Sequence, residues 1–357
     1  MARRVPDAGF WNGRRVLLTG HTGFKGAWAT IWLNRLGAKV TGFSLAPEDG
    51  NSLYAFAAAD TLCQSRIGDL RNPAVVDAAI RAADPEIIIH MAAQALVRPA
   101  VADPCGTVAT NVLGTMYLLD AARRSDVKTI VIVTSDKVYL NDGSGRAFAE
   151  DDCLGGSDPY SASKAACDIV AQSFSETYLA TSGVRMATAR GGNVIGGGDY
   201  AVDRIVPDIV RAARSGQAPI LRMPGAVRPW QHVLDCVSGY LLYAEDLHMG
   251  RDVPSRLNFG PREEHPVTVG ELTTRLLAGM GQEATFISQA DTSVHEMHWL
   301  QIDASRARQL LGWDSQLSTQ QAIDWTASWY RDVESAKDDA RLVTERQIDK
   351  YYDHCAS

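Results

Sequence analysis

Short apolar runs alternate with amphipathic stretches through the first half of the chain. The runs predict β-strands at 14–19, 38–44, 86–91, 128–134 and 185–189, and a further strand ending at 67. The amphipathic stretches between them predict helices, among them 73–83 and 107–123. Residues 86–91 are continuously apolar, as in a strand that is buried on both faces. The alternation predicts an α/β fold, a Rossmann-type doubly wound parallel sheet.

This alternation is lost in the second half. There the pattern predicts helices at 202–215, 235–245, 269–280 and 305–311, and short strands at 220–223, 231–233 and 257–260. The pattern of the last stretch, 318–352, predicts helix with a charged, solvated face. We therefore expect a dinucleotide-binding domain over 12–190 and a smaller C-terminal substrate-binding lobe over 191–357, some segments of which can return to the sheet.

Composition excludes several classes of protein. The 357 residues carry a formal net charge of −7, which argues against binding to nucleic acid. The six cysteines include no Cys-x-x-Cys pair, so we expect neither a zinc site nor a disulfide framework, and a reducing cytoplasm is favoured. The N-terminus lacks the apolar core of a signal peptide, and no apolar run approaches the ~20 residues of a membrane span. A small anionic ligand could still be bound by the arginines Arg98, Arg204, Arg222 and Arg228.

A glycine motif follows the first predicted strand and opens the first predicted helix. Gly20, Gly23 and Gly26 have the spacing that lets backbone N–H groups approach a pyrophosphate at a helix N-terminus. We therefore predict that this loop binds a dinucleotide.

The second strand ends at Ser44, where an acidic residue usually contacts the cofactor ribose. A serine does not repel a 2′-phosphate and Lys25 could attract one, so this turn leaves NAD and NADP open. Asp69 could meet the adenine amino group, cap the following helix, or do both. The candidate cofactor-binding residues are Gly20, Thr22, Gly23, Phe24, Lys25, Gly26, Ser44, Asp69, Leu70, Ala92, Ala93, Gln94, Asn111, Thr134, Tyr160 and Lys164.

Tyr160 and Lys164 are four residues apart, which places them on one face of a helix. An ammonium group one turn away should lower the tyrosine pKa, so that the phenolate can remove a proton from a substrate hydroxyl. By itself the spacing is also compatible with a chance pair on a surface helix.

Several stretches together resemble one family. They lie at 19–26, 92–98, 134–137, 158–164, 192–199, 224–233 and 301–307. The glycine and Tyr-x-x-x-Lys motifs resemble the extended short-chain dehydrogenase/reductase family. The Thr-Ser-Asp-Lys stretch at 134–137, Gly-Gly-Gly-Asp at 196–199 and Arg-Pro-Trp-Gln-His at 228–232 resemble its nucleotide-sugar 4,6-dehydratases, in particular those acting on CDP-glucose.

The resemblance implies NAD as the cofactor and a 4-keto-6-deoxy sugar as the product. Tyr160, with Lys164 and Thr134, would deprotonate the sugar C4 hydroxyl. Asp136 would be the acid at C6 and Lys137 the base at C5; Lys137 could instead form a salt bridge or a phosphate contact. The implied substrate-binding residues are Gln94, Thr134, Asn193, Arg204, Arg228, Gln231 and His232. Of these, His232 could instead belong to the core.

Two alternatives share these motifs. A nucleotide-sugar C4 epimerase would need Tyr160 and Lys164 but not the pair Asp136–Lys137. A catalytically silent dinucleotide sensor should have lost part of this set. The segment 140–149 departs from the family pattern, which leaves the sugar pocket less defined than the cofactor site. We also expect a homo-oligomer, a dimer or a tetramer.

Overall fold

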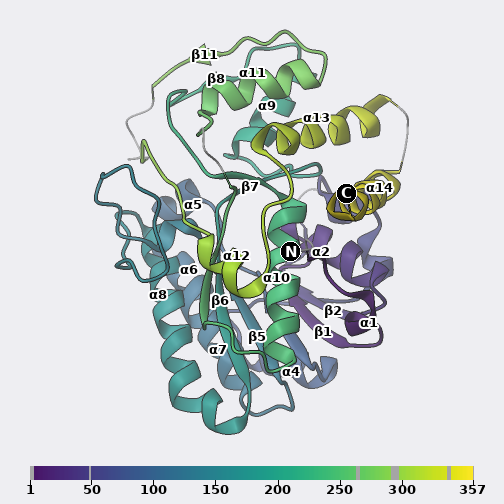
Figure 1. Cartoon of the computed structure of the whole chain (residues 1–357), viewed down its shortest axis with the longest axis vertical. Helices are drawn as coiled ribbons and strands as arrows, with labels where there is room; N and C mark the ends of the chain where they lie inside the picture. Colours follow the sequence, from purple (N-terminus) through teal and green to yellow (C-terminus); the bar gives the residue numbers. More distant parts are fainter. Residues whose placement is uncertain (1–3, 48–49, 263–265, 291–296, 336–338, 357) are drawn as a thin grey trace.

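The computed structural model describes residues 4–47, 50–262, 266–290, 297–335 and 339–356. A seven-stranded parallel sheet runs through its centre in the order β10-β6-β5-β4-β1-β2-β3 (Figure 1). The strands are β1 Arg15–Thr19, β2 Lys39–Ser44, β3 Gln64–Ile67, β4 Ile87–His90, β5 Thr129–Val133, β6 Arg185–Gly191 and β10 Arg256–Phe259. The predicted Rossmann-type fold is confirmed.

Helices cover both faces of the sheet because successive strand side chains point to opposite sides. In β5, Val131 and Val133 enter one core, whereas Ile130 and Ile132 enter the other. The first core includes side chains of α2 (Phe24–Arg35) and α10 (Val233–His248). The second includes side chains of α4 (Pro73–Ala83), α7 (Gly114–Ala122) and α8 (Pro159–Phe174). A strand buried on both sides needs no polar face, which explains the continuous apolar runs.

The predicted helix 107–123 is divided into three parts. It comprises the end of α6 (Pro104–Val108), a π-helical turn η2 (Ala109–Leu113) and α7. A π-turn adds a residue locally and is common near functional sites. Here it contains Asn111.

Elements beyond residue 190 lie in more than one part of the molecule. β10 joins the central sheet and α10 packs on it. Several others form a smaller lobe above the sheet in Figure 1. It includes α9 (Ile205–Arg214), α11 (Val269–Gly279), α13 (Thr319–Ser335) and the two-stranded sheet of β8 (Ile220–Leu221) and β11 (Ile287–Ser288). A second small sheet pairs β7 (Asn193–Ile195) with β9 (Trp230–His232).

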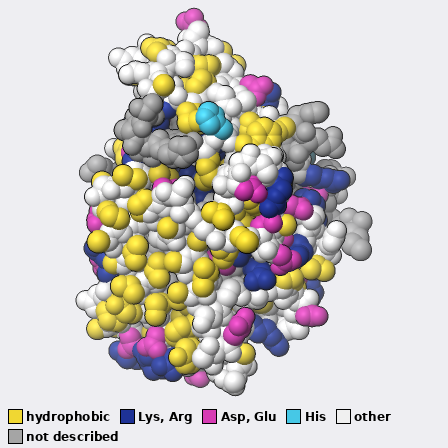
Figure 2. All heavy atoms as spheres, turned by 90° about the vertical axis from the view of Figure 1, so that its left-hand side faces the viewer, with side chains coloured by type: hydrophobic (Ala, Val, Ile, Leu, Met, Phe, Trp, Pro, Cys, Tyr) yellow, Lys and Arg dark blue, Asp and Glu magenta, His cyan; other side chains and the backbone are white. Residues whose placement is uncertain are grey.

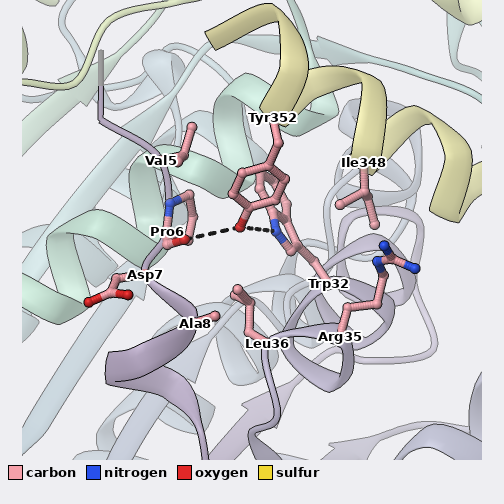
Figure 3. A pocket seen from close by; sticks show the side chains of 9 residues that line it. All are labelled: Val5, Pro6, Asp7, Ala8, Trp32, Arg35, Leu36, Ile348 and Tyr352. Carbon is pink, nitrogen blue, oxygen red and sulfur yellow. Dashed lines mark hydrogen bonds between the residues drawn. The ribbon is translucent and has the colours of Figure 1, made fainter. Parts of the chain in front are cut away.

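The C-terminal stretch predicted as helix over 318–352 consists of two helices, α13 and α14 (Ala340–Ala356). One face of α14 packs against α2. There the Trp32 indole donates to the Tyr352 hydroxyl at 3.0 Å, and that hydroxyl donates to the Pro6 carbonyl at 3.0 Å (Figure 3). Charged side chains on the other side of α14, among them Asp349, Lys350 and Asp353, are exposed, in agreement with the predicted solvated face.

Shorter elements complete the chain. They are α1 Ala8–Trp11, α3 Leu53–Phe56, η1 Ala59–Leu62, α5 Val97–Ala102, η3 Asp136–Val138, η4 Ser175–Leu179, η5 Ala180–Ser182 and α12 Ser305–Leu311. Within the described ranges, no helix has the length and apolar character needed to cross a membrane. Those ranges also contain no cluster of three or more side chains suited to bind a metal.

Candidate active site

The glycine loop lies between the carboxyl end of β1 and α2. Gly20 has φ +76°, and a Cβ there would lie 2.8 Å from the Ala92 backbone nitrogen. A Cβ on Gly26 would lie 1.9 Å from the Gly20 carbonyl oxygen. Both positions therefore require glycine. Gly23 caps α2 without a side-chain hydrogen bond, and the first turn of α2 has no acidic residue. The N-terminus of α2 thus fits the pyrophosphate of a dinucleotide.

Hydroxyl groups gather beside this loop, where a ribose would be expected. The Thr22 and Ser44 hydroxyls are 2.8 Å apart, and Thr22 donates to the Leu45 carbonyl at 3.0 Å. The Asp69 carboxylate is occupied by Arg71, which lowers its pKa through their hydrogen bonds. The alternative that Asp69 caps the next helix is wrong, because Asn72 is the N-cap of α4.

Gln94 and Asn111 hold the loop that follows β4. The Asn111 side chain accepts from the Gln94 backbone N–H at 2.8 Å and donates to the Gln94 carbonyl at 3.0 Å. It also donates to the Ser163 hydroxyl at 2.8 Å, which ties the π-turn to α8. The Gln94 amide bonds the Leu96 backbone. Both side chains thus position the loop beside Ala92 and Ala93 through contacts within the protein.

Tyr160 and Lys164 are buried on one face of α8, 8% and 6% exposed. Asp158 starts the helix as its N-cap, which fixes the phase of that face. The expectation that Lys164 lowers the tyrosine pKa is wrong for this structure, because burial raises the pKa of Tyr160 to about 12. The Lys164 ammonium instead donates to the Val133 carbonyl at 3.1 Å, and burial lowers its own pKa.

The hydroxyl beside Tyr160 belongs to Ser135, which was not among the residues expected at the site. The interaction between the Ser135 and Tyr160 side chains opposes the burial effect on the Tyr160 pKa. The Thr134 hydroxyl instead donates to Asp168 at 3.0 Å, deeper in the protein. Adjacent residues at a strand end point in opposite directions, so one hydroxyl of the Thr-Ser pair had to turn away. The adjacency of Ser135 to Asp136 was the available signal.

Asp136 and Lys137 lie in η3, directly beyond β5. Asp136 is 3% exposed; Ser135 donates to its Oδ1 at 2.9 Å, while its Oδ2 has no hydrogen-bond partner among the described residues. Burial raises the Asp136 pKa, against the opposing charges of Lys137, Arg228 and Lys25. The Lys137 ammonium lies 5.9 Å from the centre of the Tyr160 ring. The structure therefore brings an acid and an amine to the tyrosine.

The predicted substrate-binding residues divide into two groups. Arg228 is buried and acts electrostatically on Asp136, and Arg204 acts on Tyr160 while pairing with Asp199 at 3.1 Å. Gln231 and His232 belong to the interior instead. Gln231 is 1% exposed and donates to the Phe259 carbonyl at 2.8 Å.

His232 is fully buried, accepts the Leu234 backbone N–H as the N-cap of α10, and lies edge-on to Trp28 and Trp325. Burial lowers its pKa to about 3, so it stays neutral. These contacts favour the alternative of a core histidine. Asn193 begins β7, where it pairs in register with Trp230.

A surface pocket lies away from these residues. Its volume is about 460 Å³, and it is formed by the N-terminal arm, the C-terminal end of α2 and α14 (Figure 3). It contains none of the candidate residues. A second pocket of about 280 Å³ includes Arg228 together with Trp230, Gln301 and Arg308. The candidate active-site residues are therefore identified from their contacts with one another, and not from the first of these pockets.

A family model described as the NAD dependent epimerase/dehydratase family matches residues 16–260. The chain belongs to this family. The matched range includes the glycine loop, η3, α8 and Arg228, so it contains nearly all the residues that gather at the candidate site. The family resemblance expected from the sequence motifs is confirmed, and NAD agrees with the family's description.

Relatives within this class cover most of the chain. It is 38% identical over 356 residues to a CDP-glucose 4,6-dehydratase of Salmonella typhimurium, covering 97% of this chain and 98% of that protein. It is 32% identical over 273 residues to a dTDP-glucose 4,6-dehydratase of Streptomyces antibioticus, covering 74% and 75%.

Solved structures of the family share the fold. A double mutant of a Streptomyces venezuelae dTDP-glucose 4,6-dehydratase with NAD bound is similar with a TM-score of 0.76 and 27% identity, covering 90% of this chain and 98% of that chain. A Thermus thermophilus UDP-glucose 4-epimerase in complex with NAD has a TM-score of 0.77 and 23% identity, covering 90% and 99%. The second likeness concerns the fold alone.

Proposed function

We propose that this protein is a nucleotide-sugar 4,6-dehydratase that converts CDP-D-glucose to CDP-4-dehydro-6-deoxy-D-glucose and water, with NAD recycled in each turnover. The observation that carries the proposal is the position of Asp136 and Lys137 beside Tyr160. A C4 epimerase of this family would use Tyr160 without needing that pair. The CDP-glucose 4,6-dehydratase that is 38% identical over nearly the whole chain supports the same substrate.

The first step is oxidation at the sugar C4. NAD, when bound, would supply the two-electron chemistry: hydride removal at C4 and hydride return at C6. Tyr160 accepts the C4 hydroxyl proton as its phenolate, and Ser135 and the positive charge of Arg204 favour that form because both oppose the rise in the tyrosine pKa. Lys164 adds a buried positive charge on the same helix face. Gly20, Gly23 and Gly26 hold the pyrophosphate end of the cofactor.

Elimination follows once C4 is a ketone. The ketone acidifies the C5 hydrogen, and Lys137 removes it as a proton. Asp136 donates a proton to the C6 hydroxyl, which leaves as water. Burial raises the pKa of the Asp136 carboxyl, which favours the protonated form that a general acid needs, and its Oδ2 makes no hydrogen bond to the described residues. Lys137 then returns its proton to C5 while C6 is reduced. The proton that Tyr160 took from the C4 hydroxyl replaces the one that Asp136 gave to the leaving water, so protons and electrons balance.

The remaining candidates hold the nucleotide diphosphate. Arg228 and Arg204 supply positive charge near Asp136 and Tyr160, and Asn193 begins the neighbouring strand β7. Guanidinium groups form strong charge-assisted hydrogen bonds with phosphate. We assign residues 12–190 mainly to the cofactor and 191–357 mainly to the nucleotide sugar.

Incubation with CDP-glucose tests this function. The purified protein should form a product with the ultraviolet absorbance of a 4-keto sugar in alkali, without added oxidant, and denaturation should release NAD(H). Comparison of CDP-, dTDP- and UDP-glucose tests the substrate. Consumption of one NAD per product, or formation of CDP-galactose, would contradict the proposal.

We further propose that the protein is a cytoplasmic homo-oligomer. None of the six cysteines, all of which lie in the described ranges, forms a disulfide, which suits a reducing compartment. Exposed apolar side chains lie on the face formed by α5, α6, η2 and α8 (Figure 2): Val101, Val108, Leu113 and Ile169. Such a surface is typical of an interface between subunits. Ile169→Asp should shift the mass measured by sedimentation toward the monomer, whereas an unchanged mass would exclude this face.

A further inference from the structure

A fully buried ion pair lies behind the candidate site and takes no part in the proposed chemistry. Arg190, near the end of β6, donates from Nε and Nη2 to the Asp168 carboxylate at 2.9 and 2.8 Å. The side chains are 1% and 0% exposed. Buried ion pairs often add little net stability compared with apolar residues, but their bidentate geometry restricts the groups they join. The role of this pair is therefore inferred from the elements that it connects.

On one side the pair is attached to the helix of the redox residues. Asp168 lies four residues beyond Lys164 and eight beyond Tyr160, so the three side chains share one face of α8. Lys164 and Asp168 also interact electrostatically, since Asp168 opposes the lowering of the Lys164 pKa by burial. A displacement of the Arg190 side chain would therefore also displace Asp168 and the helix face that it shares with Lys164 and Tyr160.

On the other side the pair is attached to both ends of the segment 134–139, which carries Asp136 and Lys137. At the start, the Thr134 hydroxyl donates to Asp168 at 3.0 Å. At the end, Arg190 Nη1 donates to the Tyr139 hydroxyl at 2.9 Å, and the guanidinium lies 5.1 Å from the Tyr139 ring centre.

The Tyr139 hydroxyl is fixed further by donating to Asn258 of β10 at 2.6 Å. Its ring stacks on Phe148 at 5.2 Å. Tyr139 is 2% exposed, so water has little access to replace these contacts.

We propose that the Asp168–Arg190 pair, with Thr134 and Tyr139 as its contacts, is a positioning element that sets the placement of Asp136 and Lys137 relative to Tyr160 and Lys164. The inference rests on the proposed function, in which the first two residues perform elimination and the last two perform oxidation. None of its four side chains takes a chemical step in the proposed mechanism. It couples the two half-reactions by holding both sets of residues at one sugar ring.

This arrangement predicts which step fails first. Oxidation depends on α8, which keeps its own N-cap and helical hydrogen bonds when a contact to 134–139 is lost. Elimination depends on η3, a single short turn with few hydrogen bonds of its own. Loosening its end should therefore slow elimination more than oxidation. Small misplacements of reacting groups cost about 10- to 100-fold in rate.

Tyr139→Phe is the most selective test, because it removes one hydroxyl and keeps the stacked ring. We expect kcat for dehydration to fall about 10- to 100-fold with KM unchanged. Reduced cofactor absorbing near 340 nm should accumulate on the enzyme during turnover. In the ligand-free protein, amide hydrogen exchange at 135–139 should be faster than in the parent.

The matched control is Tyr351→Phe. This tyrosine is also fully buried, and it donates to the Asp235 carboxylate at 2.8 Å, outside the segment 134–139. It should leave kcat, the 340 nm signal and exchange at 135–139 as in the parent. In a background of Arg190→Lys, which keeps one charge but not the fork, Tyr139→Phe should have no further effect.

The outcomes separate the two proposals. If the parent converts CDP-glucose but Tyr139→Phe behaves like Tyr351→Phe, the positioning role is wrong and the proposed function stands. Equal slowing of oxidation and elimination in Tyr139→Phe would also overturn the positioning role. If the parent converts no nucleotide sugar, the proposed function fails, and hydrogen exchange at 135–139 still decides whether the pair holds that segment.

Discussion

Two buried aspartates in this protein have opposite surroundings. Asp235, at the start of α10, accepts the Gln316 and Leu317 backbone N–H groups at 2.8 and 3.2 Å, and the Tyr351 hydroxyl at 2.8 Å. Ser315 adds a fourth bond at 3.0 Å. Asp136 accepts only from Ser135, and its second oxygen has no partner within the described part of the chain.

The difference distinguishes an aspartate with a structural role, Asp235, from one with a proposed catalytic role, Asp136. A buried polar group without a partner costs free energy, so proteins keep few of them. For Asp235, hydrogen bonds from donors of the C-terminal segment offset that free-energy cost. These bonds also attach α14 to α10. The unpartnered oxygen of Asp136 has no structural benefit, and it lies among Lys137, Arg228 and Tyr160, where a substrate could bind. The comparison predicts that changes at the first site affect stability and changes at the second affect rate.

The largest effect is expected at Tyr160. Tyr160→Phe removes the group that accepts the C4 proton and should lower the rate of dehydration by about 10⁴-fold. No reduced cofactor should appear near 340 nm, because oxidation itself is blocked. Lys164→Ala should cost nearly as much, and the double variant should be little worse, since groups that act as a unit are non-additive. Losses that multiply would contradict a joint role.

Asp136→Asn should have the next largest effect on rate. It keeps the size of the side chain but removes the proton that the C6 hydroxyl needs, so elimination should slow by about 10²- to 10³-fold. Oxidation should survive, and bound reduced cofactor should therefore build up at 340 nm. Its absence, or dehydration at the parent rate, would reassign the acid. Lys137→Met should likewise allow oxidation while abolishing deuterium exchange at C5.

At the supporting site the change should appear in stability instead. Asp235→Ala leaves buried donors without an acceptor and should lower the free energy of unfolding by about 3 kcal/mol, measured in urea. The kcat of the folded fraction should remain that of the parent. Asp353→Ala, at an exposed position on α14, is the control and should change neither quantity. A loss of kcat in Asp235→Ala would break the division between the two regions.

The smallest effect concerns Glu245, a second buried carboxylate of α10. It accepts the Trp11 indole at 2.7 Å and the Asp7 backbone N–H at 2.9 Å, and burial raises its pKa from 4.5 to about 7. Because the folded pKa exceeds the ordinary value, the stability that Glu245 contributes at low pH is lost as the pH rises from the ordinary value to the folded one.

Glu245→Gln cannot ionise, and its amide oxygen can still accept both bonds. Its stability relative to the parent should therefore increase by about 2 kcal/mol between pH 5 and pH 8, measured by urea unfolding at each pH. If the difference in free energy of unfolding between Glu245→Gln and the parent is independent of pH, then ionisation of Glu245 does not affect stability between pH 5 and pH 8.

The sequence by itself determined the features that depend on neighbouring residues. Alternating apolar runs predicted the parallel sheet, because a strand buried on both faces needs no polar side. The spacing of Gly20, Gly23 and Gly26 predicted the cofactor loop, and the spacing of Tyr160 and Lys164 predicted their common helix face. Each pattern involves only a few neighbouring residues, whose relative positions are determined by the local backbone geometry.

Only the tertiary structure decided features that join distant segments. Which hydroxyl of the Thr134–Ser135 pair faces Tyr160 depended on Asp168, a residue of another element. The direction of the Tyr160 pKa depended on how completely surrounding elements exclude water. The pairing of Asp168 with Arg190 likewise joins α8 to β6. Burial and charge pairing are set by what packs around a group, and local sequence spacing does not specify those neighbours.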